Sequence, residues 1–539
     1  MLYLFAFIIS LVITMLLIPP MMKWADKIGA IDIPDARKVH TRAIPRVGGI
    51  AMVAGSVASI LLLADLNQQI VSIISGFLII WVFGIWDDKS DLNYKIKFLG
   101  QLLAVIIVVL WGDVVVRSFP FIDSQLPEYI AIPFSIFALI GITNAINLSD
   151  GLDGLAGGTS LITISMISLL AYDAGGDFVV LISMAVAGSI LGFLRHNTYP
   201  ARLFMGDSGS QFLGFSLGVL VIVLSQSVNS AMSPLIPLIV LGLPILDTLA
   251  VMGQRIYERR SPFSPDKNHI HHKLLDIGFD HYEAVFIIYI VQTLLIGTAY
   301  FMLYESDLIL ALIYIVICIS VLGAFHFAHA NQWKFYTTEI KEISNIRLVL
   351  SKVVANGWFT VGTTQVLKLL VPLLLVLSAL FAIDIPSDMA ILSTLLLLLF
   401  IIAIYINRPS LLLLEKAVVY VVSVMAVYLM PVGDANLDFY NIINVLFLLL
   451  VIAFVLRVRF SREKTFQVTP LDYLVIILVI IVPNLPEVHL EDSNIGEMAV
   501  KLVILFYASE AVMGLKESSS ISMRLGVLSS LAIVLVRGI

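Results

Sequence analysis

Long apolar runs alternate with short polar segments along all 539 residues of the chain. A run of roughly 17 to 25 apolar residues can cross the hydrocarbon core of a bilayer as a helix. Eleven such spans are predicted first, near residues 2–20, 48–64, 70–86, 98–116, 130–146, 159–172, 178–194, 210–227, 236–252, 284–303 and 309–328. Seven more, several of them short, are predicted near residues 364–383, 389–406, 417–432, 440–456, 472–485, 497–513 and 524–537. The pattern therefore predicts an all-α, polytopic transmembrane protein with about eleven helices followed by an extension of about seven.

Lysine and arginine residues concentrate in every second loop between these spans. The loops that carry them lie near residues 23–46, 89–97, 195–202, 255–273, 334–352, 408–416, 457–464 and 516–524. Because basic loops stay on the cytoplasmic side, this alternation predicts that the N-terminus lies outside. The apolar run 2–18 has no basic residue before it, so a retained first helix is predicted rather than a cleaved signal peptide.

Composition narrows the class of protein further. Hydrophobic residues make up 60% of the chain, charged residues make up 13%, and the mean hydropathy is +1.01. These values exclude an ordinary soluble domain. The single cysteine, Cys318, excludes an intrachain disulfide and a cysteine metal cluster. The sequence has neither a GxxxxGK[ST] loop, which an ATP-driven pump would use, nor a Gly-x-Ser-x-Gly nucleophile elbow.

The segment 144–158, NAINLSDGLDGLAGG, places polar residues between two long apolar runs. Asn147, Asp150 and Asp153 recur at intervals of three, so they share one face if the segment is helical. The glycines among them let backbone and ligand approach closely. Hard oxygen ligands at the end of a hydrophobic helix favour a divalent cation at the membrane surface. The alternative is a polar turn between two helices.

A second polar cluster, in the segment around residue 90, combines acids with lysines. Asp87, Asp88 and Asp91 are followed by Lys95 and Lys97. The acids can hold a metal ion or accept a proton, and the lysines can hold phosphate. The alternative is an ordinary charged loop at the membrane edge.

A third polar cluster, at residues 201–215, places Asp207 before the small pair Ser208-Gly209 at the start of a predicted span. The N–H groups of a helix N-terminus can bind an anion, and Asp207 can bind the cation that accompanies a diphosphate. In the same interpretation Phe204 stacks on a base. Alternatively, Asp207 only caps the helix and Phe204 lies at the membrane edge.

A fourth polar cluster contains His269, His271 and His272. Three histidines within four residues first suggest zinc. However, only His269 and His272 share a helical face, and no cysteine lies in a cytoplasmic loop. Binding and positioning of phosphate is therefore preferred. Asp247, in or beside the ninth predicted span, is a weaker candidate that could also pair with a neighbouring helix.

Taken in this order, five motifs resemble the polyprenyl-phosphate N-acetylhexosamine-1-phosphate transferase superfamily. They are DARKVHTRAIPRVGGI, WDDKSDL, NAINLSDGLDGLAGG, FMGDSGSQFLG and NHIHHKL. The resemblance covers about residues 1–330, roughly three-fifths of the chain. The HIHH form is similar to the bacterial branch that starts O-antigen, enterobacterial common antigen or teichoic acid linkage units with a GlcNAc-type sugar. The alternative branch transfers phospho-MurNAc-pentapeptide in peptidoglycan synthesis.

The resemblance implies an enzyme of the bacterial cytoplasmic (inner) membrane that uses Mg²⁺, or Mn²⁺ in its place, on the cytoplasmic face. It would transfer a sugar-1-phosphate from a UDP-sugar to undecaprenyl phosphate and release UMP. It implies Asp207 and Asn147 as metal ligands and Asp87 and Asp88 at the lipid phosphate, with His269, His271 and His272 beside the reacting phosphates. The implied substrate-binding residues are Lys97, Asp150, Asp153, Phe204, Asp91 and Lys95. Direct displacement is preferred over a covalent phospho-aspartate because the acceptor phosphate, with a second pKa near 6, is already mostly dianionic.

Three regions are predicted: a transferase domain at 1–330, a connecting amphipathic segment at 331–368, and a C-terminal extension at 369–539. The resemblance does not cover the extension, which could serve oligomerisation, including a homodimer, docking of envelope-glycan synthesis partners, lipid handling or a second activity. Nothing indicates a nucleic-acid partner. A transporter is the rival from another class, but it predicts acids near mid-span, whereas these acids cluster at helix ends.

Overall fold

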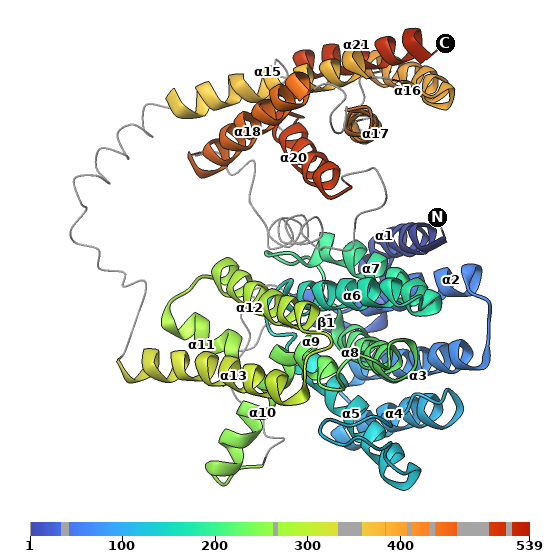
Figure 1. The fold of residues 1–539 in the computed structure, drawn as a ribbon, viewed down its shortest axis with the longest axis vertical. Coiled ribbons are helices and arrows are strands. Elements are labelled where there is room, and N and C mark those ends of the chain that lie inside the picture. Colours follow the sequence, from blue (N-terminus) through green and yellow to red (C-terminus); the bar gives the residue numbers. More distant parts are fainter. Residues whose placement is uncertain are drawn as a thin grey trace. The chain divides into compact units, whose positions relative to one another are not determined.

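The computed structural model describes residues 2–33, 43–261, 268–331, 358–382, 384–406, 412–430, 437–460, 495–513 and 520–538. These residues form two compact units, one up to residue 331 and the other from residue 358 (Figure 1). Apart from one two-stranded sheet, the regular elements of the described residues are helical. The prediction of an all-α, polytopic membrane protein is confirmed, because eleven of these helices are long and apolar enough to cross a membrane.

The first unit contains the elements that position the polar clusters. Its helices are α1 (Leu2–Ile28), α2 (Gly48–Leu63), α3 (Gln68–Ser90), α4 (Tyr94–Ile106), α5 (Glu128–Leu148), α6 (Leu155–Asp173), α7 (Asp177–Asn197), α8 (Gly206–Val223), α9 (Ile236–Val240), α10 (Gly242–Tyr257), α11 (Ile270–Ile277), α12 (His281–Phe301) and α13 (Asp307–Ala330). Short π-helical segments, η1 (Ile107–Trp111) and η2 (Leu224–Val228), extend α4 and α8. Strands β1 (Ile31–Asp32) and β2 (Ile44–Pro45) pair antiparallel, with Ile31 opposite Pro45.

Helix α8 is the centre of this unit. It contacts α2, α3, α5, α6 and α7. In an apolar stretch of 18 residues within α8 and η2, 83% of the residues are buried, whereas 6% are buried in the corresponding stretch of α13. Small residues permit the close approach of its neighbours, as is usual between membrane helices. A Cβ atom at Gly84 of α3 would lie 2.4 Å from the Cα of Ser208, and one at Gly214 of α8 would lie 2.7 Å from the Cα of Thr143. The N-terminus of α8 is therefore held tightly against α3.

One predicted span differs in detail from the structure. The run 236–252 forms two helices, α9 and α10, rather than one. Pro237 lies in the first turn of α9, and Pro244 lies in the first turn of α10. Proline has no N–H to donate and is accommodated in a first helical turn, so both prolines favour a new helix start at these positions. The N-terminal half of α10 carries Asp247, which lies beside His269 and Ile270.

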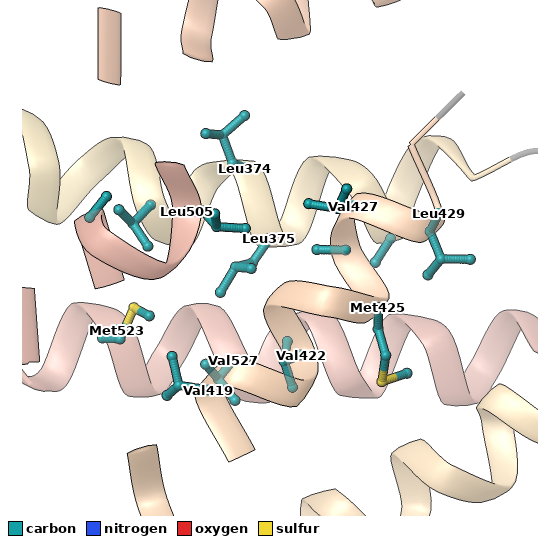
Figure 2. Close-up of a cluster of buried hydrophobic side chains, with 14 of the residues drawn as sticks. Leu374, Leu375, Val419, Val422, Met425, Val427, Leu429, Leu505, Met523 and Val527 are labelled. Carbon is teal, nitrogen blue, oxygen red and sulfur yellow. The ribbon is translucent and has the colours of Figure 1, made fainter. Parts of the chain in front are cut away.

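The second unit contains α15 (Trp358–Phe381), α16 (Ser387–Ile406), α17 (Leu412–Tyr428), α18 (Leu437–Phe460), α20 (Ile495–Met513) and α21 (Ser520–Gly538). Leucine, valine and methionine side chains from α15, α17, α20 and α21 pack together in its buried cluster (Figure 2), to which α16 and α18 also contribute. Arg524 of α21 forms a bidentate ion pair with Glu415 of α17, with N–O distances of 2.7 and 3.0 Å. The Tyr420 hydroxyl donates to Glu510 of α20. This unit is thus a packed helical bundle with a few internal polar contacts.

Several predictions for the C-terminal half stay predictions. The span near 472–485 and most of the connecting segment 331–368 lie outside the described residues. Helices form at the predicted spans near 389–406, 417–432, 440–456 and 497–513 (α16, α17, α18 and α20), but these four are not among the described helices that are long and apolar enough to cross a membrane. The role of the extension is untested.

Candidate active site

Ends of four helices bring four predicted site residues together. Asp87 lies near the C-terminus of α3, Lys97 near the start of α4, Asn147 near the end of α5 and Asp207 at the start of α8. Lys97 Nζ lies 2.5 Å from Asp87 Oδ2 and 2.7 Å from Asp207 Oδ2. Asn147 Nδ2 donates to Asp207 Oδ1 at 2.9 Å. We call Asp87, Lys97, Asn147 and Asp207 the charged cluster.

Asp88 holds the N-terminus of α8. Its carboxylate accepts the Asp207 N–H at 2.7 Å, the Ser208 N–H at 3.1 Å and the Ser208 hydroxyl at 2.7 Å. Its exposed fraction is 8%. A carboxylate at this position satisfies backbone donors that the helix itself leaves free and complements the positive end of the helix dipole. Asp88 therefore positions Asp207 from a neighbouring helix.

The glycine pair after β2 docks onto the loop before α8. Gly48 N–H donates to the Phe204 carbonyl at 2.9 Å, and Gly49 N–H donates to the Met205 carbonyl at 2.8 Å. A Cβ atom at Gly49 would lie 2.2 Å from the backbone nitrogen of Gly209, so only glycine permits this approach. Phe204 is half-buried in this loop.

The loop between α5 and α6 is tied to the loop between α7 and α8. Asp153 Oδ2 accepts the Ala201 N–H at 2.8 Å. Asn197 accepts the Gly154 N–H at 2.9 Å and donates to the Leu203 carbonyl at 2.9 Å. Asp153 is thus turned toward the neighbouring loop, while Asp150 is exposed.

We call residues 268–273, which include His269, His271 and His272, the histidine segment. Asp247 of α10 holds this segment in place. Asp247 Oδ2 lies 2.9 Å from His269 Nδ1, and Asp247 Oδ1 accepts the Ile270 N–H at 2.8 Å. The ring of His271 packs on Gly151, where a Cβ atom would lie 2.1 Å from His271 Nε2. A pocket opens here, and its lining includes Ser149, Asp247 and His271. Asp247, the weaker candidate from the sequence, therefore holds the histidine segment. His271 of that segment contacts the loop that carries Asp150.

His271 is a neutral group in this environment. Its exposed fraction is 4%, and burial, followed by the neighbouring His272, lowers the pKa of His271 to about 3. Its ring lies 4.3 Å from the ring of His272, between centroids. A neutral imidazole can donate one hydrogen bond and accept another. His271 can therefore orient a phosphate oxygen in its neutral form, through its ring N–H.

Two predicted substrate-binding residues lie apart from the charged cluster. Asp91 ends α3 in a left-handed conformation, with a φ of 43°, and its side chain is 95% exposed. Its carboxylate lies 3.7 Å from Arg46 Nη1. Lys95 is exposed two residues before Lys97, and residues two apart on a helix do not face each other. No contact brings Asp91 or Lys95 into the charged cluster.

Other polar residues of the site carry no local sequence signal. Asn197 joins two loops, and the buried Tyr289 of α12 donates its hydroxyl to the Gly154 carbonyl at 2.7 Å. A Cβ atom at Gly158 would lie 1.8 Å from that hydroxyl oxygen. The glycine-rich segment 144–158 is the signal that could have indicated a close partner, although it does not say which residue that partner is.

The donor set fits a hard divalent cation shared with a substrate. Asp87, Asp207 and Asn147 supply carboxylate and amide oxygens, which are the ligands that Mg²⁺ prefers. Within the described residues, no three His, Cys, Asp or Glu side chains are arranged to hold a metal ion by themselves. Mg²⁺ commonly uses one or two carboxylates and completes its shell with water and substrate phosphates. The cluster therefore suits a metal that binds together with a diphosphate.

Comparison with known proteins agrees with the geometry. Residues 70–225 match the model of glycosyl transferase family 4. The chain is 41% identical over 289 residues to a probable undecaprenyl-phosphate N-acetylglucosaminyl 1-phosphate transferase of Bacillus subtilis, covering 53% of this chain and 81% of that protein. It is 38% identical over 304 residues to the decaprenyl-phosphate N-acetylglucosaminephosphotransferase of Mycolicibacterium smegmatis, covering 49% and 73% of the two chains.

A third relative is the undecaprenyl-phosphate alpha-N-acetylglucosaminyl 1-phosphate transferase of Escherichia coli K12. It is 31% identical over 282 residues, covering 51% of this chain and 76% of that protein. The segment matched by the family model contains all four residues of the charged cluster. The chain belongs to glycosyl transferase family 4, within the superfamily of polyprenyl-phosphate N-acetylhexosamine-1-phosphate transferases.

Proposed function

We propose that this protein transfers GlcNAc-1-phosphate from UDP-GlcNAc to a polyprenyl phosphate and releases UMP, with Mg²⁺ as its cofactor. The observation that carries the proposal is the convergence of Asp87, Lys97, Asn147 and Asp207 from four helices. This cluster lies within the family match. The relatives named above are all N-acetylglucosamine transferases by name, so the phospho-MurNAc-pentapeptide alternative is not favoured.

The chemical problem is an encounter between two anions. An oxygen of the acceptor phosphate attacks the sugar-bearing phosphorus of UDP-GlcNAc, and the bond from that phosphorus to the bridging oxygen breaks, so that UMP leaves with the bond electrons. Lys97 supplies a positive charge at the place where these phosphates must meet, and its two carboxylate partners hold the ammonium in position. Asp88 and Asn147 keep Asp207 in its orientation. Positioning and charge stabilisation are the main contributions that a protein makes to phosphoryl transfer.

Mg²⁺ would be held by Asp207, with Asn147 and Asp87 as further oxygen donors. When bound, the ion would neutralise the diphosphate and stabilise the charge that develops on UMP. The residues around it have separate tasks. His271 is neutral and packs on Gly151, so it can hold a phosphate oxygen by hydrogen bonding at the edge of the loop that carries Asp150.

The polar clusters lie at helix ends next to basic loops, which supports a site on the cytoplasmic face of a bacterial inner membrane. UDP-sugars are available on that face. The acids of the charged cluster lie at helix termini rather than at mid-span, which argues against a transporter.

A donor panel tests the proposal. Membranes containing the protein are supplied with undecaprenyl phosphate and either UDP-GlcNAc, UDP-GalNAc or UDP-MurNAc-pentapeptide, and both UMP and lipid-linked product are measured. We expect transfer from UDP-GlcNAc and none from UDP-MurNAc-pentapeptide. Absence of UMP with every donor contradicts the proposal. Labelled UDP-GlcNAc without acceptor tests the direct route, because label on the protein or stoichiometric UMP release would require a covalent intermediate instead.

A further inference from the structure

A layer of three amide side chains lies directly behind the charged cluster. Gln101 follows Lys97 by four residues on α4, and Gln211 follows Asp207 by four on α8. Asn144 precedes Asn147 by three on α5. Residues three or four apart lie on the same face of a helix, one turn from each other. Because Lys97, Asn147 and Asp207 are close to helix ends, each amide lies one turn further into its helix. We call Gln101, Asn144 and Gln211 the amide layer.

The three amides are hydrogen-bonded to one another across three helices. Gln101 Nε2 donates to Gln211 Oε1 at 3.2 Å and to Asn144 Oδ1 at 3.3 Å. Asn144 Nδ2 donates to Gln101 Oε1 at 2.9 Å and to the Ile140 carbonyl at 2.8 Å. Gln101 and Gln211 each have an exposed fraction of 4%. Gln101 is thus the centre of the layer, and it ties α4 to both α5 and α8.

Such a network resists rotation and sliding of the helices. Amides form directional hydrogen bonds without the large cost of placing a charge among apolar residues. In a low-dielectric environment, breaking one of these bonds leaves a buried polar group without a partner, which is unfavourable. A helix that turned or slid by a fraction of a turn would break the amide bonds and would also move the charged-cluster residue one turn away. The amide layer and the charged cluster are therefore coupled through the same three helices.

We propose that Gln101, Asn144 and Gln211 are positioning residues, which fix the rotation of α4, α5 and α8 so that Lys97, Asn147 and Asp207 meet. The inference rests on the proposed function for its catalytic consequence, but its geometric content is independent of the substrate. Among the described residues, none of the three amides is hydrogen-bonded to a member of the charged cluster. Their effect reaches the reaction only through the placement of the charged cluster.

Gln292 offers a matched control. It is a fully buried glutamine of α12, and its Nε2 donates to the Thr163 hydroxyl at 3.0 Å and to the Val240 carbonyl at 2.8 Å. It ties α12 to α6 and α9, which carry no residue of the charged cluster. Replacement of Gln292 by leucine removes buried amide bonds of the same kind without acting on α4, α5 or α8.

The test compares Gln101→Leu with Gln292→Leu in the full-length protein in detergent. For Gln101→Leu we expect kcat to fall at least about tenfold, since small displacements of catalytic groups cost 10- to 100-fold in rate, while KM for UDP-GlcNAc changes less than about threefold. For Gln292→Leu we expect a similar loss of thermal stability with kcat kept within about twofold. Equal kcat losses in the two variants overturn the inference.

A second readout does not depend on turnover. The protein is produced with lysine labelled with ¹³C at Cε, and the NMR signal of Lys97 is assigned by its absence in Lys97→Arg. We expect Gln101→Leu to move this signal toward those of exposed lysines and Gln292→Leu to leave it in place. An unmoved Lys97 signal in Gln101→Leu contradicts the inference. If the signal moves but the wild-type protein transfers no sugar, the proposed function fails while the positioning role stands.

Discussion

Lys97 donates a hydrogen bond to Asp207 at 2.7 Å, although the two residues are 110 positions apart in the chain. Lys97 begins one helix and Asp207 begins another, so the contact exists only because α3 and α5 hold α4 and α8 in place. This ammonium is also 2.5 Å from Asp87. The pair thus marks the place where the phosphates and a divalent cation would have to meet.

Replacing Asp88 tests its role as a cap for α8. In Asp88→Asn, an amide N–H₂ replaces one of the two oxygens that accept from Asp207 and Ser208, so a donor faces a donor. We expect a loss of roughly 1–3 kcal/mol in stability together with a loss of transfer activity, measured by thermal unfolding and by UMP release.

The control for this variant is Asp91→Asn. The Asp91 side chain is 95% exposed, and asparagine tolerates the left-handed conformation at this position. We expect unfolding and activity close to those of the wild type. If Asp88→Asn is as stable as Asp91→Asn, the capping role is wrong, and a direct chemical role for Asp88 becomes the better explanation.

Gly151→Ala tests the contact between the histidine segment and the loop that carries Asp150. The added Cβ would lie 2.1 Å from His271 Nε2, so the imidazole must move. We expect activity to fall at least about tenfold, measured as kcat/KM for UDP-GlcNAc. Gly297→Ala is the matched variant, because a Cβ there meets nothing within 4 Å. Similar activity in both variants would show that the position of His271 does not matter for transfer.

The low pKa of His271 predicts a dependence of stability on pH. In the unfolded chain a histidine has a pKa near 6.5, whereas the folded value is lowered to about 3 by burial and by His272. The unfolded state therefore binds a proton first as the pH falls, so the contribution of His271 to stability is present above pH 6.5. It is lost at roughly 1.4 kcal/mol per pH unit between about 6.5 and 3.

The measurement is the difference in unfolding free energy between wild type and His271→Gln, taken at several pH values from 7.5 to 5. Glutamine cannot gain this proton, so we expect the advantage of the wild type to shrink as the pH falls. His269, His272 and Asp247 are kept in both proteins and contribute equally to first order. A difference that stays constant over this range contradicts a neutral, buried His271.

Asp247→Asn tests the support of the histidine segment. The asparagine oxygen can still accept one of the two donors, the Ile270 N–H or the His269 ring, but not both as the carboxylate does. Groups that orient a functional histidine contribute about 10- to 100-fold to activity in other sites. We expect a loss of this order in kcat/KM, together with a loss of roughly 1–3 kcal/mol in stability because one buried donor is left without its acceptor. Unchanged kinetics would leave Asp247 as a purely structural residue.

The sequence predicted which residues meet more successfully than it predicted how they are held. Charge alternation and span positions place Asp87, Asn147 and Asp207 at helix ends on one side of the membrane, and the structure brings them together. In contrast, the use of Asp88 as a cap for a helix 119 residues later depends on how α3 packs on α8. Helical periodicity describes faces of single helices and carries no such information.

The absence of packing information in the sequence also explains where the other predicted site residues differ from the structure. Asp91 and Lys95 have suitable chemistry, but the end of α3 and the first turn of α4 direct them elsewhere. The sequence does not reveal the amide layer either, because only the packing of three helices shows that Gln101, Asn144 and Gln211 are partners.

The most direct test of the account is acceptor-dependent release of UMP by Asp207→Asn, compared with wild type at equal amounts of folded protein. The substitution keeps the size of the side chain but removes the negative charge that pairs with Lys97 and would hold the cation. With UDP-GlcNAc, undecaprenyl phosphate and Mg²⁺, we expect wild-type protein to release UMP and form the lipid-linked sugar, and Asp207→Asn to lose at least about 100-fold of this activity. Near-normal turnover in Asp207→Asn would contradict the central claim that the charged cluster carries the transfer.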